Sequence, residues 1–187
     1  MSLDNGDQIS VQSTTQVQQE RFPSGEILLS AVQKEYDYEQ ARKVALETRA
    51  GILIPFAAAV LTFAVSYIKI SDLKKIKIIF VTDAFLYFFY LLLALIAIAS
   101  LIVSLFFLMK VFIASKYNRL SIGEFDMNYG MEKKDEVAIA LASKYRDIIH
   151  HNQKVNNKKT KDYQIGVYAI LISTITTILV YGISLNI

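Results

Sequence analysis

Three long stretches of the chain contain no charged side chain, and they limit the possible folds more than any other feature. They are residues 51–68, 84–109 and 165–187. A helix rises about 1.5 Å per residue and the hydrocarbon core of a bilayer is about 30 Å thick, so each stretch has roughly the length of one membrane span. A helix of a soluble bundle would keep a charged face. The sequence therefore predicts three transmembrane helices, with a kink and not a stop at Pro55 in the first one.

The distribution of basic residues predicts the orientation of these spans. Five lysines and arginines precede the first span, four lie between the first two spans, and eleven lie between Lys110 and Lys161. Because basic loops resist translocation, the two richer segments should face the cytoplasm. The N-terminus is then inside and Ile187 outside, which an odd number of spans allows.

The complete prediction is an all-α membrane protein with N-terminal and central cytoplasmic helices. Residues 1–23 are polar and glutamine-rich, lack the features of a cleavable signal peptide, and are predicted to be a disordered tail. The other expected units are an N-terminal cytoplasmic helix at 24–50, a two-span hairpin with a short external loop at 51–109, a cytoplasmic helical region at 110–164, and the third span at 165–187.

The helix predicted for residues 24–50 carries apolar residues on a broken stripe. This pattern favours either docking against another helix or a position on the lipid headgroups. The stripe consists of Ile27, Leu28, Ala31, Val32, Tyr38, Ala41, Ala45 and Leu46.

After the second span, residues 110–120 are expected to continue as helix into the cytoplasm, and a new helix should begin near Met131 and run into the third span. One stripe of that new helix begins apolar and becomes amide-bearing. Inward asparagines lose water and must find another amide or a ligand. We therefore expect a helical-bundle oligomer with a core of Tyr145, Ile149, Asn152 and Asn156, within a stripe that also holds Ala138, Leu141, Ala142 and Ile148.

Cations and amides beside this stripe have two interpretations. They could form a juxtamembrane collar attracted to anionic lipid, or a pocket for the phosphates of a nucleotide or oligonucleotide. The phosphate-binding candidates are Lys144, Arg146, His150, Lys154, Asn157, Lys158, Lys159 and Lys161. Adjacent histidines on a helix diverge by about 100°, so His150 and His151 cannot chelate one metal together. No metal or cofactor is expected.

The sequence offers little support for catalysis or coupled transport. It has no cysteine, which excludes thiolate metal sites and cysteine nucleophiles. Glycine-rich phosphate loops, nucleophile elbows and paired carboxylates inside a span are also missing, and charged residues that would mark a proton-coupled transporter do not occur in the spans. We expect a protein that is not an enzyme.

Small and hydroxylated residues lie on one face of the last span. They favour close packing against another helix, or they line a water-filled path in an oligomer. The face contains Gly166, Ala169 and the pore-lining candidates Ser173, Thr177, Tyr181 and Ser184; Ala94, Ala97, Ser100 and Ser104 of the second span could face it.

The order of these elements, with Tyr145, Ile149, Asn152, Asn156 and Lys159 ahead of a last span, resembles small bacterial membrane effectors of anti-phage defence. The CBASS, Pycsar and Hailong systems are examples, and the resemblance covers residues 132–187. It implies a homo-oligomer of the inner membrane, with a tetramer favoured. A nucleotidyltransferase or cyclase made by a neighbouring gene would supply its nucleotide signal.

A Hailong-like effector would be held closed by a single-stranded DNA oligomer, whereas effectors of the cyclic-nucleotide systems open on binding. This chain has no separate soluble sensor domain, so its helices would have to carry the ligand site. The resulting expectation is an ion channel or pore, gated by a nucleotide or oligonucleotide, that depolarises the membrane. The alternatives are a non-conducting membrane adaptor that docks a protein partner, and a membrane-disrupting toxin that needs no ligand.

Overall fold

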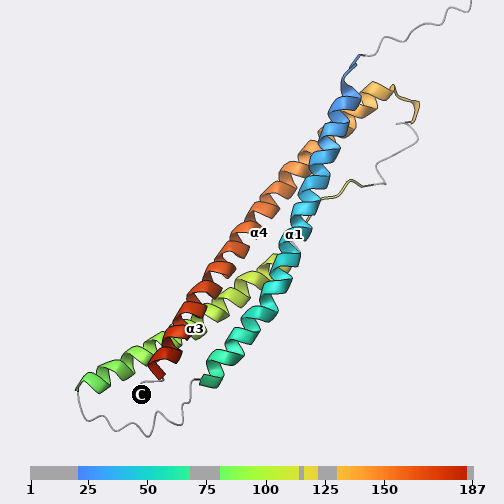
Figure 1. The fold of residues 1–187 in the computed structure, drawn as a ribbon. Helices are drawn as coiled ribbons and strands as arrows, with labels where there is room; N and C mark the ends of the chain where they lie inside the picture. The colour runs from blue at the N-terminus through green and yellow to red at the C-terminus, as the bar shows by residue number, and fades with distance from the viewer. Residues whose placement is uncertain (1–20, 68–80, 114–115, 122–129, 185–187) are drawn as a thin grey trace, which may run out of the picture.

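The computed structural model describes residues 21–67, 81–113, 116–121 and 130–184 (Figure 1). The described residues form three long helices and no strand: α1 (Gly25–Tyr67), α3 (Val81–Phe112) and α4 (Lys134–Ser184). Each is long and apolar enough to cross a membrane. The predictions of an all-helical chain and of three candidate membrane spans are thereby confirmed. The tail at 1–20 and the loop at 68–80 lie outside the described residues.

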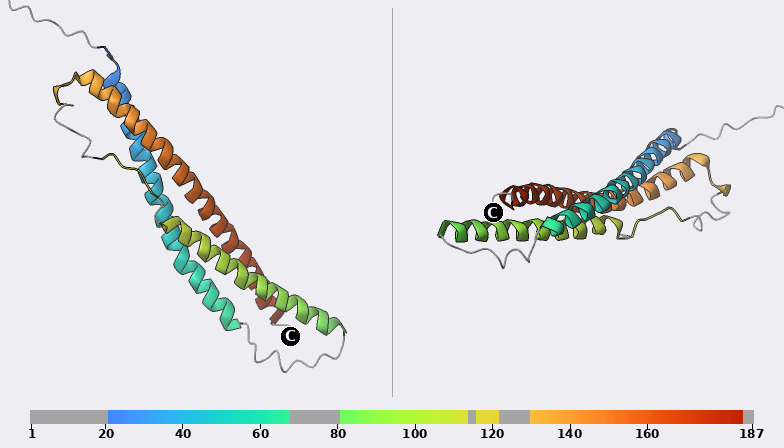
Figure 2. Two further views of the ribbon diagram at one scale, coloured as in Figure 1. Left: turned by 180° about the vertical axis from the view of Figure 1, so that it is seen from behind. Right: turned by 60° about the horizontal axis from the view of Figure 1, so that its bottom comes forward.

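The helices form an elongated bundle in which α1 and α4 start at the same end and run in the same direction (Figures 1 and 2). At that end the backbone N–H of Phe22 donates to Asp135 Oδ2 at 2.8 Å, and Lys134 forms an ion pair with Glu26. Helix α3 packs against both partners only in the apolar half. We call the other half, residues 25–50 of α1 and 134–164 of α4, the stalk.

Both α1 and α4 pass from the stalk into the apolar half without interruption. α1 is a single helix of 43 residues that continues through Pro55, as expected for a proline inside a membrane helix. α4 is a single helix of 51 residues that begins three residues after the predicted start at Met131. The prediction that the helix starting near Met131 runs into the last apolar stretch is therefore confirmed, and residues 25–50 likewise join the first apolar stretch in one helix.

Buried and half-buried residues of α4 recur at alternating steps of three and four, which is the spacing of a coiled-coil seam. The predicted inward stripe is confirmed for Ala138, Ala142, Ile149, Asn152 and Asn156, and its partner helix is α1 of the same chain. The full seam comprises Asp135, Ala138, Ala142, Tyr145, Ile149, Asn152, Asn156, Lys159, Tyr163, Gly166, Ile170, Ser173, Thr177 and Val180.

The face with which α1 meets this seam differs from the predicted stripe. Of that stripe only Val32 and Leu46 point toward α4, whereas the six other members are exposed. The true docking face has the same alternating steps but includes polar residues that a search for apolar positions overlooks. It consists of Gly25, Leu29, Val32, Tyr36, Glu39, Lys43, Leu46 and Ala50.

In the apolar half, small residues let α3 and α4 approach closely. A Cβ on Gly166 would come within 2.8 Å of Leu108 Cγ, so this position has no room for a side chain. Ser104 Oγ donates to the carbonyl of Gly166 at 2.9 Å, and Ser173 Oγ donates to the carbonyl of Ala97 at 3.0 Å. The small face predicted on the second span thus does meet the hydroxyl face of the last one.

The expectation that residues 110–120 continue as helix is wrong. α3 ends at Phe112, and residues 116–121 follow a non-helical path beside the stalk (Figure 2). Side chains of α4 hydrogen-bond to the backbone of this segment and hold it in its non-helical path.

Candidate functional site

The side chain of Asn152 holds the segment 116–121 against α4. Its Nδ2 donates to the carbonyl of Asn118 and its Oδ1 accepts the N–H of the same residue, both at 3.0 Å. His151 Nε2 lies 2.9 Å from the carbonyl oxygen of Lys116. Because the backbone N–H and C=O of Asn118 are both used by the asparagine, they are unavailable to a helical ladder. Asn152 is therefore an intrachain clamp.

One turn further along α4, Asn156 is the centre of a buried polar cluster. Its Nδ2 donates to the carbonyl of Glu39 at 2.9 Å and to Glu39 Oε2 at 2.6 Å. Tyr117 donates its hydroxyl to the same carbonyl at 3.0 Å. Asn156 is fully buried, and its Oδ1 has no partner among the described residues. The amide cannot flip, because its oxygen would then face the Glu39 carboxylate.

Tyr117 is kept protonated in this cluster. Burial raises the pKa of its phenol, and the Glu39 carboxylate and Tyr36 raise it further, while the hydrogen bond to Asn156 and the charge of Arg42 oppose these effects. The Lys43 ammonium lies 4.8 Å from the centre of the Tyr117 ring. The phenol is therefore a stable hydrogen-bond donor to α1.

Two basic residues complete the contacts between α1 and α4. Arg42 donates to Asn157 Oδ1 at 2.9 Å and to Thr160 Oγ1 at 3.2 Å. Lys159 is buried, and its Nζ lies 2.7 Å from Glu47 Oε1. Asn152, Lys159 and the amide nitrogen of Asn156 therefore find their partners within one chain, whereas Asn156 Oδ1 and Thr177 Oγ1 have none among the described residues.

The residues predicted to form an oligomer core lie inside a single chain. Tyr145, Ile149, Asn152 and Asn156 all lie in the seam between α1 and α4. Tyr145 packs edge to face on Tyr36, with ring centres 5.3 Å apart. The need for a second amide, which motivated the oligomer core, is met by groups of the same chain except at Asn156 Oδ1.

Most of the predicted phosphate-binding residues lie on the opposite side of α4. At about 100° per residue they cover one third of the helix circumference, on the side opposite the seam, and they extend over about 22 Å of helix. Asn157 in this set is still reached by the long side chain of Arg42 of α1. All are exposed. We call this set the basic face: Arg146, His150, Lys154, Asn157, Lys158 and Lys161. Lys159, also predicted to bind phosphate, is not part of it because it is buried against Glu47.

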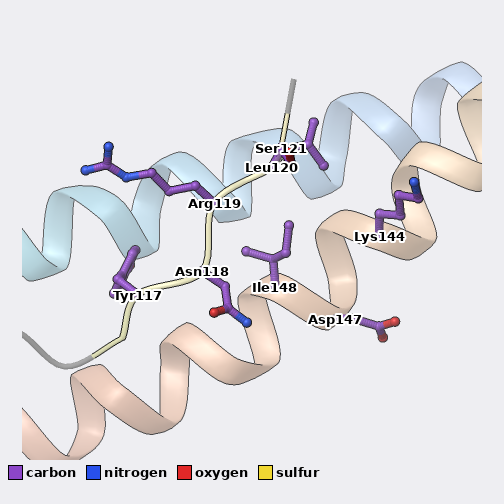
Figure 3. A pocket seen from close by; sticks show the side chains of 8 residues that line it. All are labelled: Tyr117, Asn118, Arg119, Leu120, Ser121, Lys144, Asp147 and Ile148. Atoms are coloured by element: carbon purple, nitrogen blue, oxygen red, sulfur yellow. The ribbon is translucent and has the colours of Figure 1, made fainter. Parts of the chain in front are cut away.

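The last of these candidates, Lys144, lies on another flank of α4, where it lines an open groove of about 400 Å³ (Figure 3). Ile148 points from α4 toward the extended segment, and Arg119 points away from α4. Sequence reasoning missed Arg119, whose only signal was its place in a basic segment. Asp147 lines this groove, and its carboxylate also lies 3.6 Å from Arg146 Nε of the basic face, so it weakens both places as sites for an anion. The lining residues are Tyr117, Asn118, Arg119, Leu120, Ser121, Lys144, Asp147 and Ile148.

The predicted pore-lining residues have mixed environments. Ser173 and Thr177 are buried, Tyr181 is exposed, and Ser184 is half-buried with its hydroxyl 2.7 Å from the carbonyl of Tyr181. Thr177 Oγ1 has no hydrogen-bond partner within the described part of the chain. Within one chain, close helix packing accounts for Ser173, and a water-filled path stays a prediction about an assembly.

Comparisons of the chain with protein-family models, with curated proteins and with solved structures find no match. Among the described residues, no group of three or more histidine, aspartate and glutamate side chains could hold a metal ion. The basic face and the polar cluster behind it are therefore the features on which a function can be argued.

Proposed function

We propose that this protein is an oligomeric effector of anti-phage defence in the bacterial inner membrane, which conducts ions under the control of a nucleotide or oligonucleotide. The stalk would lie in the cytoplasm and the C-terminus in the periplasm. The resemblance of residues 132–187 to small defence effectors and the excess of basic residues before the apolar stretch that starts at residue 51 and in 110–161 support this orientation and role.

The observation that carries the proposal is that the basic face and the last candidate span belong to one uninterrupted helix. Arg146, Lys154, Lys158 and Lys161 place four cations along one exposed side of the stalk. A phosphate chain that follows this side would release counterions from each contact, which gives salt-dependent binding with little sequence preference. A helix that carries both the ligand and the span transmits any tilt of the stalk into the membrane.

The seam supplies a route by which such a tilt would act. Asn152, Asn156 and Lys159 are polar residues at coiled-coil positions, and residues of this kind fix the register of a helix pair at a cost in stability. Ligand bound to the basic face would shift α4 relative to α1. The same shift would part α4 from α3 around Ser173 and Thr177, which opens the hydroxyl face to water.

A binding experiment tests the ligand site. Lys154→Glu, Lys158→Glu and Lys161→Glu together should abolish salt-sensitive binding of short single-stranded DNA and of cyclic dinucleotides to the purified protein. The matched control reverses three exposed cations that lie off the basic face, at Arg21, Arg49 and Lys133. If the control variant loses binding equally, or the basic-face variant retains it, the site assignment is wrong.

Ion flux tests the activity. The protein reconstituted in liposomes should show a potassium or sodium flux that changes on addition of the oligonucleotide or nucleotide that binds. The triple variant should show the flux of the unliganded state whether or not ligand is added. Absence of flux under every ligand condition would refute conduction.

A non-conducting adaptor is the second candidate, and one observation favours it. The stalk side of α1 that faces away from α4 exposes large apolar side chains, including Ile27, Tyr38 and Val44. An exposed apolar surface of this extent on a helix is typical of a protein-binding face. The flux measurement separates the two functions, because an adaptor would bind its partner without conducting.

A further inference from the structure

The exposed side of α1 carries a second repeat with coiled-coil spacing. Its members follow one another by four, three, four, three, four, three and four residues, and every one is exposed. We call it the outer stripe: Ile27, Ala31, Lys34, Tyr38, Ala41, Ala45, Thr48 and Ile52. Lys34 is nine residues from Gly25 of the docking face, which corresponds to about half a turn around the helix. α1 thus has two such faces on opposite sides, and α4 covers one of them.

The outer stripe has the chemistry of a helix-packing surface. Ile27, Tyr38 and Ile52 are 74%, 63% and 68% exposed. Ala31, Ala41 and Ala45 between them would let a second helix approach closely. A stripe with a mean spacing of 3.5 residues stays close to one side of a helix over several turns. A partner helix can therefore contact it along its whole length.

The geometry of α1 limits what this partner can be. The stripe starts near the free end of the stalk and runs about 37 Å to Ile52, where the charge-free part of α1 begins. A helix that follows the whole stripe therefore lies along the stalk and reaches the start of the charge-free stretch at the same level as α1. A second copy of this chain meets that condition, because copies inserted in one membrane share orientation and depth.

The charges of the stalk also favour a second copy that uses the same stripe. In a parallel pair, Lys34 of each copy lies opposite Lys34 of the other, and the hole into which it packs includes Glu35 of the second copy, whose carboxylate offsets the two like charges. A single polar residue of this kind fixes the register of a helix pair at a cost in stability. Lys34 and Glu35 are both exposed in the single chain. We propose that two copies of this chain pair through their outer stripes, α1 against α1, about an axis normal to the membrane.

The pairing would supply the interface that an oligomeric effector needs, and to that extent it rests on the proposed function. It does not require a bound ligand. The pairing leaves the basic face of each copy free on the far side of α4. It also positions the two stalks so that α1 is a fixed centre around which each α4 can shift.

Disulfide formation tests the pairing, because the chain contains no cysteine of its own. Single variants Ala31→Cys, Ala41→Cys and Ala45→Cys, oxidised in membranes of the expressing cells, should form disulfide-linked dimers. The controls Gln33→Cys and Ser143→Cys are exposed but lie off the stripe. Because a disulfide needs its two Cα atoms within about 7 Å, we expect about tenfold less dimer for the controls.

A second variant makes the test independent of chance collisions. Ala41→Glu places like charges opposite each other at the pairing surface, while the exposed position leaves the single chain folded. In this background the dimer formed by Ala31→Cys should fall to the level of Gln33→Cys. Equal cross-linking on and off the stripe, no cross-linking at any stripe position, or cross-linking that survives Ala41→Glu would each overturn the proposal.

Discussion

The buried pair of Lys159 and Glu47 leads to an asymmetric prediction about stability. The side chain of Lys159 is only 4% exposed, whereas that of Glu47 is 30% exposed. Glu47→Gln leaves a buried ammonium without a carboxylate, and losing one partner of a buried pair costs about 3 kcal/mol or more. Lys159→Met leaves a carboxylate that water can reach, and we expect a loss of about 1 kcal/mol, as for exposed pairs.

The double variant distinguishes this reasoning from a general loss of packing. Once Lys159 is methionine, the residue at 47 no longer compensates a buried charge, so adding Glu47→Gln should have little further effect. The coupling free energy of the double-mutant cycle should then be about 3 kcal/mol or more, equal to the whole cost of Glu47→Gln in the parent. Reversible unfolding of the purified protein in mixed micelles, followed by circular dichroism, measures all three variants against the parent.

Lys159→Met also separates an effect on stability from an effect on ligand binding. Because its ammonium is buried, Lys159→Met should leave the affinity for single-stranded DNA unchanged, whereas Lys158→Met, one residue away and exposed, should weaken it. The reasoning is refuted if Lys159→Met destabilises as much as Glu47→Gln. It is also refuted if Lys159→Met weakens binding more than Lys158→Met.

Three further predictions follow from other contacts. Gly166→Ala should destabilise the helix pair by about 1–3 kcal/mol, measured by unfolding in mixed micelles, because α3 leaves no room for a Cβ. Asn152→Ala should speed amide hydrogen exchange at Asn118 by at least about tenfold, since both of its backbone hydrogen bonds are lost. Hydrogen bonds from the backbone, that of Phe22 first, lower the pKa of Asp135 below its usual 3.8. Its contribution to stability is therefore complete above that value and lost as the pH falls through the lowered pKa, and Asp135→Asn should remove this acid dependence from the unfolding curve.

Helix α4, which contains Asn152, shows what the spacing of residues can predict in this chain and what it cannot. Helical spacing correctly predicts that Ala138, Ile149 and Asn156 lie on one inward side. It does not identify what covers them, since an inward asparagine is satisfied equally by a second chain, by a ligand or by another part of the same chain. In the structure Glu39 and the backbone of Asn118 supply those partners.

The docking face of α1 could not be found in the same way. Its seam uses Tyr36, Glu39 and Lys43, which a hydrophobic pattern assigns to solvent, and the apolar residues that the pattern selects are largely exposed. Likewise, nothing local in residues 116–121 stops a helix. The non-helical path is held at Asn118 by Asn152, which is distant in sequence, and this contact exists only after α4 has folded.

The sequence by itself determined the three apolar helices, because the absence of charge over a bilayer's length is a property of consecutive residues and needs no partner. The tertiary structure alone decided which of the polar residues in the stalk are available for binding. Lys158 and Lys159 are chemically identical neighbours, but about 100° of helix rotation places one in solvent and the other beside Glu47.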